Sequence, residues 1–482
     1  MGIERGLKVL MAASEMSPYA KTGGLADVTG SLPKALDSLG NVDIRIIIPK
    51  YRIIDDAYYG LKEIPDPVRF YMGGRPHEIR IKYRDSAEGW QTYFIESDEY
   101  FRGDGLYDYG TDAQTFAFFS RAVLEAAKAL DFRPDVIHCN DWHTGLIPTY
   151  LKTIYSNDPF FADSTTIFTV HNLGYQGIFP KEVLPELDLG WEEFTADKLE
   201  FFDRISFIKG GLGYSDVIST VSENYAREIQ TPQYGEGLDG LLRYRRDSLY
   251  GIVNGLDYEV WDPMTDGDIE RNYDLSSIEN KVENKIALQR DNYISEDAEA
   301  PLIGIVSRLT YQKGLDMVAD TVHEMVSLGA QFVLLGTGDD WYQQLFQRLA
   351  NDLPSRIGIN LTFNEAIARR IYAGSDMFLM PSRYEPCGLG QLISMRYGTV
   401  PVVRRTGGLA DTVQEYDPVT GEGTGFSFDD ASSSALILAI RRALEIYSDR
   451  DSWRKLVLNG MGKDFSWVHS AREYVKLYRS AM

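Results

Sequence analysis

Short apolar runs alternate with amphipathic stretches along the whole chain. We expect buried strands at residues 8–12, 44–48, 136–139, 166–170, 217–220, 303–306, 332–335, 377–380 and 400–403. Helical patterns lie between them, for example at residues 113–130, 315–328 and 365–373. The alternation predicts an α/β protein with two doubly wound domains and parallel sheets. Such sheets bind ligands beyond the carboxyl ends of their strands, so polar residues that directly follow a strand are the strongest site candidates.

The domain boundary is expected near residues 245–265. Residues 251–262 are rich in turn formers and precede a polar stretch, and residues 279–292 form a helical pattern that leads into the next strand. We therefore predict an N-terminal domain over 1–248, a second domain over 249–462 and a C-terminal segment over 463–482. The helix expected at residues 470–481 can pack against either domain.

One hexapeptide, Thr-Gly-Gly-Leu-Ala-Asp, occurs twice, at residues 22–27 and 406–411. Each copy follows a basic residue, Lys21 or Arg405, and joins a predicted strand to a predicted helix. A Gly-Gly pair lets backbone N–H groups approach a ligand, and a helix N-terminus favours an anion. Two ordinary helix starts can share a turn sequence, but six identical residues at two such corners favour a binding role. We expect each domain to offer one corner to a shared cleft.

Composition restricts the kind of partner. The chain has 482 residues, 44% of them hydrophobic, and a formal net charge of −22, which argues against nucleic acid or an anionic membrane. A small anionic ligand needs only a few placed cations. Two cysteines, Cys139 and Cys387, make no disulfide framework, and the sequence has no signal-peptide pattern or membrane-length apolar run. We therefore expect a cytoplasmic protein.

The densest polar motif follows the strand expected at residues 377–380. Glu385 lies at its carboxyl end, and Gly388 and Gly390 leave N–H groups of the next helix open to a phosphate. Glu385 can also be a first-turn carboxylate that favours the helix dipole. Another loop carries Arg308 and Lys313, which suit phosphate oxygens, although a solvated basic loop would carry the same residues. The two loops together favour a phosphate site.

Two histidine motifs also follow predicted strands. His171 can contact a sugar hydroxyl, although a structural histidine is the commoner case. Residues 138–143 have the residue types of a metal site but not the spacing of common zinc motifs, and Asp141 is placed to cap the helix after it. We therefore expect no metal. The sequence also has no dinucleotide fingerprint, Walker A loop or hydrolase nucleophile elbow.

The ordered set of motifs resembles the bacterial glycogen synthases and plant starch synthases, which are ADP-glucose-dependent α-1,4-glucosyltransferases. The resemblance runs from about residue 7 to Trp467 and rests on Lys-Thr-Gly-Gly-Leu-Ala-Asp-Val at 21–28, His-x-x-Asp-Trp-His at 138–143, His-Asn at 171–172, Asn-Gly at 254–255, Ser-Arg-Leu-x-x-Gln-Lys-Gly at 307–314 and Glu-Pro-Cys-Gly-Leu at 385–389. It implies the glycosyltransferase B fold, in which two Rossmann-like domains face a cleft. It also implies that the C-terminal helix crosses back to the N-terminal domain.

The resemblance also implies roles for individual residues. Lys21 would meet the sugar nucleotide, Arg308 and Lys313 would neutralise its diphosphate, and Asp141 and His171 would surround the transferred glucose. The implied catalytic set is Lys21, Asp141, His171 and Glu385. The implied substrate-binding set is Lys21, Gly24, Asn254, Arg308, Gln312, Lys313, Phe363, Cys387, Gly388, Leu389 and Gly390.

Two positions depart from the family pattern, Phe363 and Gly390, and a third, Ile393, differs only from broader relatives. Phe363 stands where the family usually has Tyr. An aromatic ring that can stack on adenine is therefore kept, and the Tyr hydroxyl is lost. Gly390 replaces a hydroxyl residue of many bacterial members, which leaves only a backbone N–H for phosphate. Broader relatives have a second glutamate eight residues after the first; Ile393 stands there, and ADP-glucose synthases commonly lack that glutamate too.

The resemblance implies a retaining enzyme that elongates α-1,4-glucan in glycogen biosynthesis. Glucose would pass from ADP-glucose, a co-substrate, to the non-reducing 4-hydroxyl of glycogen or a maltooligosaccharide, with no cofactor or metal. The alternatives are a related enzyme that uses UDP-glucose or a small sugar acceptor, and a non-catalytic glucan-binding protein. The last should have lost some of its key polar groups, but Lys21, Arg308, Lys313 and Glu385 are all present.

Overall fold

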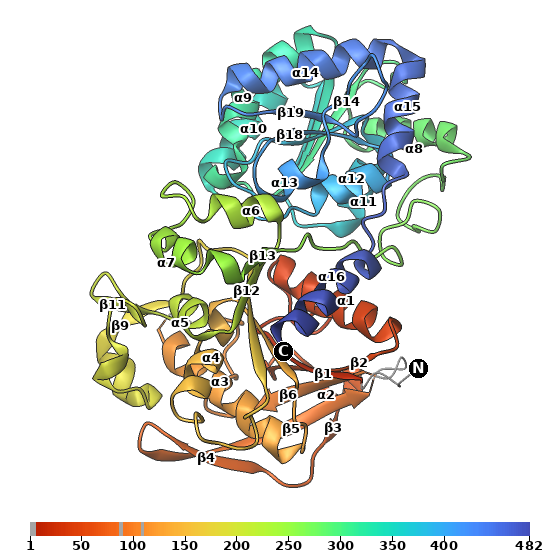
Figure 1. Ribbon diagram of the computed structural model, residues 1–482. Coiled ribbons are helices and arrows are strands. Elements are labelled where there is room, and N and C mark those ends of the chain that lie inside the picture. The colour runs from red at the N-terminus through yellow and green to blue at the C-terminus, as the bar shows by residue number, and fades with distance from the viewer. Residues whose placement is uncertain (1–5, 86–89, 108–109) are drawn as a thin grey trace. The chain divides into compact units, whose positions relative to one another are not determined.

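The computed structural model describes residues 6–85, 90–107 and 110–482. The chain forms two compact units (Figure 1): unit 1 contains the residues up to Gly255 together with Trp467–Met482, and unit 2 contains Leu256–Ser466. The predicted boundary after residue 248 is too early, because Leu249–Gly251 pair with a strand of unit 1. The chain returns to unit 1 at Trp467, later than the predicted start of the C-terminal segment at residue 463.

Unit 1 is built on a mainly parallel sheet. Within the described residues, ten strands lie in the order β13-β12-β8-β7-β1-β2-β6-β5-β3, with β4 paired to β5. They are β1 (Leu7–Ala12), β2 (Val42–Pro49), β3 (Lys62–Glu63), β4 (Val68–Met72), β5 (Arg75–Asp85), β6 (Gln91–Glu96), β7 (Val136–Asn140), β8 (Thr165–Val170), β12 (Val217–Thr220) and β13 (Leu249–Gly251). Neighbours are parallel from β13 to β6, and β5 is antiparallel. The strand order reverses at β1, where an open α/β sheet binds ligands.

Helices cover this sheet, and a small antiparallel sheet is added to it. The helices are α1 (Gly24–Ser38), α2 (Asp56–Tyr59), α3 (Asp112–Ala129), η1 (Trp142–Thr144), α4 (Leu146–Lys152), η2 (Lys181–Leu187), η3 (Trp191–Glu193), α5 (Phe207–Tyr214), α6 (Glu223–Glu228), α7 (Asp239–Tyr244), η4 (Arg246–Ser248) and α16 (Trp467–Ala481). The small sheet contains β9 (Ile178–Pro180), β10 (Glu200–Phe201) and β11 (Arg204–Ser206). The C-terminal helix α16 packs along α1 (Figure 1), and the Tyr478 hydroxyl lies 2.8 Å from Nδ1 of the buried His138.

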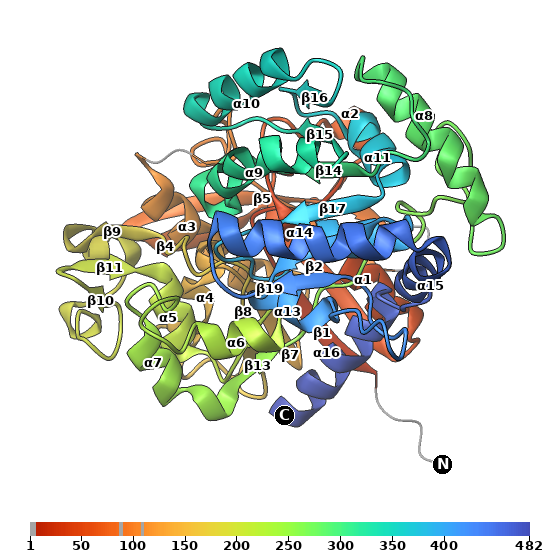
Figure 2. The ribbon, with the colours of Figure 1, turned by 90° about the horizontal axis from the view of Figure 1, so that it is seen from above.

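Unit 2 contains a fully parallel sheet. Its strands, in the order β16-β15-β14-β17-β18-β19, are β14 (Leu302–Val306), β15 (Gln331–Leu335), β16 (Ile357–Asn360), β17 (Met377–Met380), β18 (Val400–Arg404) and β19 (Phe426–Phe428). Its helices are η5 (Ile278–Asn280), α8 (Lys281–Asp291), η6 (Tyr311–Lys313), α9 (Leu315–Ser327), α10 (Asp340–Asp352), α11 (Glu365–Gly374), α12 (Gly390–Arg396), α13 (Gly407–Thr412), α14 (Ser433–Ser448) and α15 (Arg450–Met461). Figure 2 shows α14 in front of the sheet, beside α9, and α14 also packs on β18 and β19. The strand order reverses between β14 and β17.

All the strands expected from the apolar runs are present, and the expected helices correspond to α3, α8, α9, α11 and α16. The buried faces follow the sequence pattern, because β1, β7, β8, β15 and β17 are almost wholly buried, as strands of a sheet covered on both faces must be. The two-domain α/β fold is confirmed. No helix in the described part of the chain is both long and apolar enough to cross a membrane.

Candidate active site

The Glu385 loop of unit 2 holds a buried ion pair. Glu385 lies in the loop after β17, and Lys313 lies in the loop after the neighbouring strand β14. Lys313 Nζ lies 2.6 Å from Glu385 Oε2, which also accepts a hydrogen bond from Ser382 Oγ at 2.9 Å. The Glu385 side chain is 9% exposed and that of Lys313 is 18% exposed. Two of the predicted catalytic and phosphate-binding groups therefore meet at the switch point of this sheet.

Arg383 fastens the two loops to each other. Its guanidinium binds both carboxylate oxygens of Asp316, at 2.8 and 2.6 Å, and lies 3.7 Å from the centre of the Tyr311 ring. Gln312 Nε2 donates to the Tyr384 carbonyl at 3.1 Å, so the predicted contact Gln312 also acts on this loop. Arg308 is exposed, and its guanidinium has no partner among the residues that the structure describes. It is therefore available to an anion at the end of β14.

The second hexapeptide supports the Glu385 loop from behind. The Gly408 N–H donates to the Glu385 and Pro386 carbonyls at 3.2 and 3.0 Å. A Cβ atom on Gly407 would lie 2.0 Å from the Glu385 carbonyl oxygen, and one on Gly408 would lie 2.2 Å from the Cys387 carbonyl oxygen. Gly407 also has a φ of +44°, which glycine adopts without strain. These glycines let two backbone segments pack together.

The first hexapeptide has the opposite surroundings. A Cβ atom on Gly23 or Gly24 would meet nothing within 4 Å. The loop is held instead by the buried carboxylate of Glu15, which accepts hydrogen bonds from Thr22 N–H and Oγ1, both at 2.6 Å, and from Gly23 N–H at 3.2 Å. Lys21 is exposed, with Nζ 2.6 Å from Asp27 Oδ1. The open face of this glycine pair leaves room for a ligand beside Lys21.

The two copies should therefore respond differently to the same substitution. Gly408→Ala should lower the free energy of unfolding by roughly 1–3 kcal/mol, because its methyl group meets backbone. Gly24→Ala should leave the melting temperature unchanged and lower kcat/KM by a factor on the order of 10–100, because the methyl group stands where a ligand would approach. Thermal unfolding measures the first effect, and initial rates of the glucose transfer that the family resemblance implies measure the second. Equal losses of stability would contradict the different packing of the two copies.

Asp141 lies at the end of β7 in a backbone conformation that few residues other than glycine adopt, with φ 56° and ψ −179°. The sequence suggested that its side chain caps the next helix, but the structure shows no such hydrogen bond. It accepts instead from the His171 N–H at 2.7 Å, at the end of β8. Burial raises the pKa of Asp141 to about 7. Strain at a buried carboxylate beside a switch point is typical of a functional position.

His171 is held in one tautomer. Its Nε2 lies 2.9 Å from Asn140 Oδ1, while Asn140 Nδ2 donates to the Ala12 carbonyl at 3.1 Å. Because the amide oxygen can only accept, Nε2 of His171 must carry the proton, and Nδ1 keeps a lone pair. Burial lowers the pKa of His171 to about 3, so the ring is neutral at pH 7. It can accept a hydrogen bond from a hydroxyl through Nδ1.

The raised pKa of Asp141 predicts a pH-dependent stability. An unfolded Asp titrates near pH 4, so between pH 4 and 7 the native state keeps a proton that the unfolded state releases. This contribution to stability is therefore lost as the pH rises, by about 1.4 kcal/mol per pH unit, until pH 7. In urea unfolding, the stability of Asp141→Asn relative to the parent should rise from pH 5 to 7 and level off above. A constant difference across this range would show that Asp141 is not buried with a raised pKa.

The remaining predicted contacts differ in exposure. Phe363 is 89% exposed and precedes Asn364, which caps α11 by accepting from the Ile367 N–H at 3.1 Å. Asn254 is buried, and its Oδ1 has no hydrogen-bond partner among the described residues. Cys387 is buried. Gly388 has a φ of +74° and the helix α12 begins at Gly390, so residues 388–390 form the turn into that helix.

The histidines of residues 138–143 have structural surroundings. His138 is buried between Tyr478 and Thr169 Oγ1, the latter 2.6 Å from its Nε2. His143 packs against the Trp142 ring at 3.9 Å between centres. In the part of the chain that the structure describes, no group of three or more His, Cys, Asp or Glu side chains could hold a metal ion.

Most of the predicted residues follow the carboxyl ends of β1, β7 and β8 in unit 1 and of β14 and β17 in unit 2. Asn254 and Phe363 lie apart from them, after the edge strands β13 and β16. The residue that the sequence did not single out is Glu15, which holds Thr22 and Gly23. Tyr107 also donates to the Glu15 carboxylate. The sequence offered one signal for Glu15, because it is an acidic residue a few positions after the buried strand β1.

Comparisons with known proteins give the family. Residues 8–244 match the family described as the starch synthase catalytic domain, and residues 290–457 match glycosyl transferases group 1. The chain is 49% identical to a glycogen synthase of Desulforudis audaxviator, covering 99% of this chain and 97% of that protein, and 46% identical to one of Thermotoga maritima, covering 99% of each. The catalytic domain of starch synthase IV from Arabidopsis thaliana, bound to ADP and acarbose, has a TM-score of 0.91 at 34% identity, covering 99% of each chain. The chain belongs to the glycogen and starch synthase family of glucosyltransferases.

Proposed function

We propose that this enzyme transfers glucose from ADP-glucose to the non-reducing 4-hydroxyl of glycogen or a maltooligosaccharide, with retention of the anomeric configuration. The observation that carries the proposal is the buried Lys313–Glu385 pair, 2.6 Å apart at the switch point between β14 and β17, with the exposed Arg308 on the same loop as Lys313. Cytoplasmic glycogen biosynthesis is the setting that the family and the substrates favour.

The transition state needs both signs of charge. Positive charge develops at the anomeric carbon and negative charge on the leaving diphosphate. Arg308 and Lys313 would supply positive charge for the diphosphate, and a charged group that is already held in place, as Lys313 is by Glu385, contributes on the order of 10²–10³ in rate. Glu385 supplies the negative charge that stabilises the sugar cation and orients the donor. No metal ion is needed in this scheme, because cationic side chains take its place.

Retention does not require a covalent intermediate here. Retaining glycosidases use two carboxylates about 5 Å apart, one of them a nucleophile. Glu385 Oε2 accepts from Lys313 and Ser382, and the predicted site residues of unit 2 include no second carboxylate to pair with it. The family resemblance supports attack from the same face that the diphosphate leaves, with the diphosphate taking the proton of the acceptor hydroxyl. In unit 1 the neutral His171 and the Asp141 carboxyl group would accept hydrogen bonds from glucose hydroxyls.

The exposed Phe363 ring suits the adenine of the donor. Phe363→Ala should weaken ADP binding about tenfold, because stacking of one base on an aromatic ring contributes ~1–3 kcal/mol. The melting temperature without ligand should not change, because the ring is 89% exposed. Titration calorimetry with ADP tests this, and Phe363→Tyr, which restores the usual hydroxyl, should bind at least as tightly as the parent. Unchanged binding in Phe363→Ala would exclude stacking at this position.

The proposed function is tested by incubating the protein with labelled ADP-glucose or UDP-glucose and glycogen. Label should enter the polymer from ADP-glucose in preference to UDP-glucose. Preference for UDP-glucose would establish the related enzyme instead. Binding of glycogen without turnover of either donor would establish a non-catalytic glucan-binding protein.

A further inference from the structure

Arg383 connects the two loops that carry Lys313 and Glu385. It lies two residues before Glu385 in the loop after β17, and its partner Asp316 lies three residues after Lys313, in the first turn of α9. The guanidinium group donates to both carboxylate oxygens of Asp316, and such bidentate pairs are strong and directional. None of the roles that the family resemblance implies falls on Arg383 or Asp316.

Backbone contacts hold the same two loops together. The Arg383 N–H donates to the Gln312 carbonyl at 2.8 Å, and Arg383 Nη1 donates to the Tyr311 carbonyl, also at 2.8 Å. Gly314, just before α9, has a φ of +68°, and a Cβ atom there would lie 2.2 Å from the Pro381 carbonyl oxygen. The two loops are therefore in direct contact, and a shift of one must move the other.

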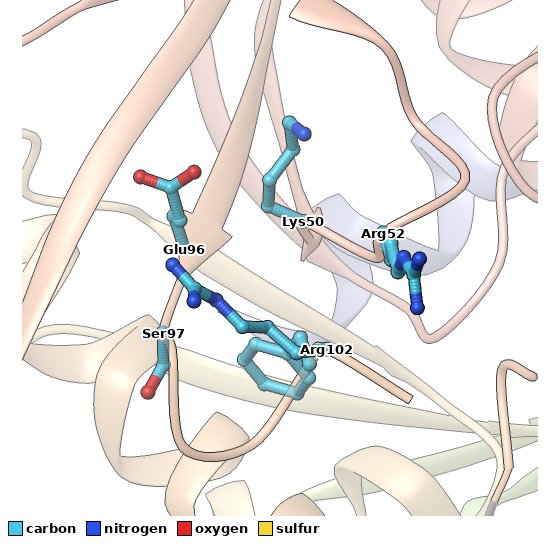
Figure 3. A pocket seen from close by; sticks show the side chains of 6 residues that line it. Lys50, Arg52, Glu96, Ser97 and Arg102 are labelled. Atoms are coloured by element: carbon cyan, nitrogen blue, oxygen red, sulfur yellow. The ribbon is translucent and has the colours of Figure 1, made fainter. Parts of the chain in front are cut away.

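The Arg383–Asp316 pair is better shielded from water than ordinary surface pairs. Figure 3 shows two arginines of such surface pairs, Arg52 and Arg102, on opposite sides of a cavity of about 450 Å³ in unit 1. Their side chains are 67% and 65% exposed, and pairs of that kind contribute little to stability. The Arg383 side chain is only 19% exposed, and the Tyr311 ring covers one face of its guanidinium group. Its charge is therefore screened less and its orientation is fixed.

Both groups of the pair stay charged. Hydrogen bonds from Arg383 lower the pKa of the Asp316 carboxyl group, and the same hydrogen bonds raise the pKa of Arg383. A planar guanidinium group that binds a carboxylate through two parallel bonds sets both their distance and their direction. A lysine in place of Arg383 would supply the charge without that direction.

The placement of Lys313 depends on this arrangement. A lysine ammonium is a point charge on a flexible stem, so its own side chain does not fix its direction. Its Nζ lies 2.6 Å from Glu385 Oε2, and it keeps that contact only while the two loops stay in register. A misplacement of roughly 1 Å at a reacting centre can cost on the order of 10² in rate.

We propose that Arg383 and Asp316 are positioning residues for glucose transfer, which lock the Lys313 loop against the Glu385 loop so that both charged groups meet the donor in one arrangement. The inference rests on the proposed function. It adds to that function two residues that act through Lys313 and Glu385 and not on the substrate itself.

Arg383→Lys tests the proposal with the positive charge kept. Its kcat should fall by a factor on the order of 10–100, and its KM for ADP-glucose should change much less, because negative charge on the diphosphate grows as the bond breaks. Asp316→Asn, which keeps the shape of the side chain, should also lower kcat. The matched control is Arg441→Lys, since Arg441 donates to Glu324 in the same unit, with Nε at 3.0 Å, and is 50% exposed. It should keep the parental kcat.

A double variant separates positioning from a general loss of structure. If Arg383 acts through the Lys313–Glu385 pair, Arg383→Lys should lower kcat far less in a Glu385→Gln background than in the parent. A purely structural role would give equal losses in both backgrounds. Equal losses, or a parental kcat in both Arg383→Lys and Asp316→Asn, would overturn the proposal.

Chemical labelling of Lys313 keeps the inference separate from the proposed function. With limiting acetic anhydride and no substrate, acetylation of Lys313 should rise several-fold in Arg383→Lys, because an ammonium released from Glu385 loses its proton more readily. Mass spectrometry of peptides measures the labelling, with the 72% exposed Lys476 as internal reference and Glu385→Gln as the positive control. If the parent transfers no glucose, a rise still supports the positioning role, and unchanged labelling rejects it.

Discussion

Glu385→Gln is expected to lower kcat by a factor on the order of 10²–10³ without unfolding the protein. Glutamine has the same shape and keeps an oxygen that can accept from Lys313 and Ser382, which now bind Oε2 at 2.6 and 2.9 Å. It loses only the negative charge. In the proposed reaction that charge opposes the positive charge at the anomeric carbon, which exists in the transition state and not in the bound substrate. The loss should therefore appear in kcat and not in KM.

Initial rates with labelled ADP-glucose and glycogen measure this effect, and thermal unfolding shows that the variant is folded. The matched control is Glu324→Gln, which removes a carboxylate from an exposed pair with Arg441, 2.5 Å apart between α9 and α14. It should keep the parental kcat. Glu385→Ala is a poorer choice, because it strands the half-buried Lys313 ammonium and so changes stability as well. A parental kcat in Glu385→Gln would mean that the charge of Glu385 takes no part in the reaction.

Both sheets show why the candidate residues could be found from the sequence. Parallel strands buried on both faces give continuous apolar runs, and each run ends where the backbone leaves the sheet. Lys313 and Glu385 are 72 residues apart in the chain, yet each lies in the loop that follows such a run. The rule that ligands bind at carboxyl ends then selects them. That their side chains form an ion pair, with Arg383 fastening the loops, depends on tertiary packing that no local pattern contains.

The parts that sequence reasoning missed have local physical causes. The strand β5 alternates buried and exposed residues over Arg75–Asp85, a half-buried antiparallel pattern that a search for wholly apolar runs passes over. The strand β13 is only three residues long and carries a glycine, so it looked like a linker and moved the predicted boundary. Glu15 was missed because its position a few residues after β1 is only a weak signal, and its role depends on its contacts with Thr22 and Gly23 in the folded structure.

The repeated hexapeptide shows the limit of motif reading most directly. Identical residues form a strand-to-helix corner in both places, so the local prediction is correct twice. The corners differ in what covers them: the Glu385 loop packs on Gly407 and Gly408, while nothing lies within 4 Å of a Cβ on Gly23 or Gly24. The backbones differ as well, because Gly23 has a φ of −155° while the equivalent Gly407 has a φ of +44°. A short motif therefore predicts the start of a helix, and the tertiary structure decides its exact backbone and whether it faces protein or ligand.

The basic residues that precede the two copies should differ in the same way. Lys21→Ala is expected to lower kcat/KM by a factor on the order of 10²–10³, because Lys21 stands beside the open glycine pair and would meet the sugar nucleotide there. Its exposed contact with Asp27 contributes little to stability, so the melting temperature should stay unchanged. Rates at low ADP-glucose concentration with saturating glycogen measure the effect.

Arg405→Ala is the internal control for Lys21→Ala, since each residue precedes the same hexapeptide. Arg405 is bound to the adjacent strand end, with its guanidinium 2.8 Å from Ser427 Oγ and 3.4 Å from Asp429 Oδ1. Its side chain is 51% exposed, and its loss should change kcat/KM by no more than about threefold. Equal losses of kcat/KM in the two variants would mean that both hexapeptides contact the substrate. The second hexapeptide would then take part in the reaction although it packs against the Glu385 loop.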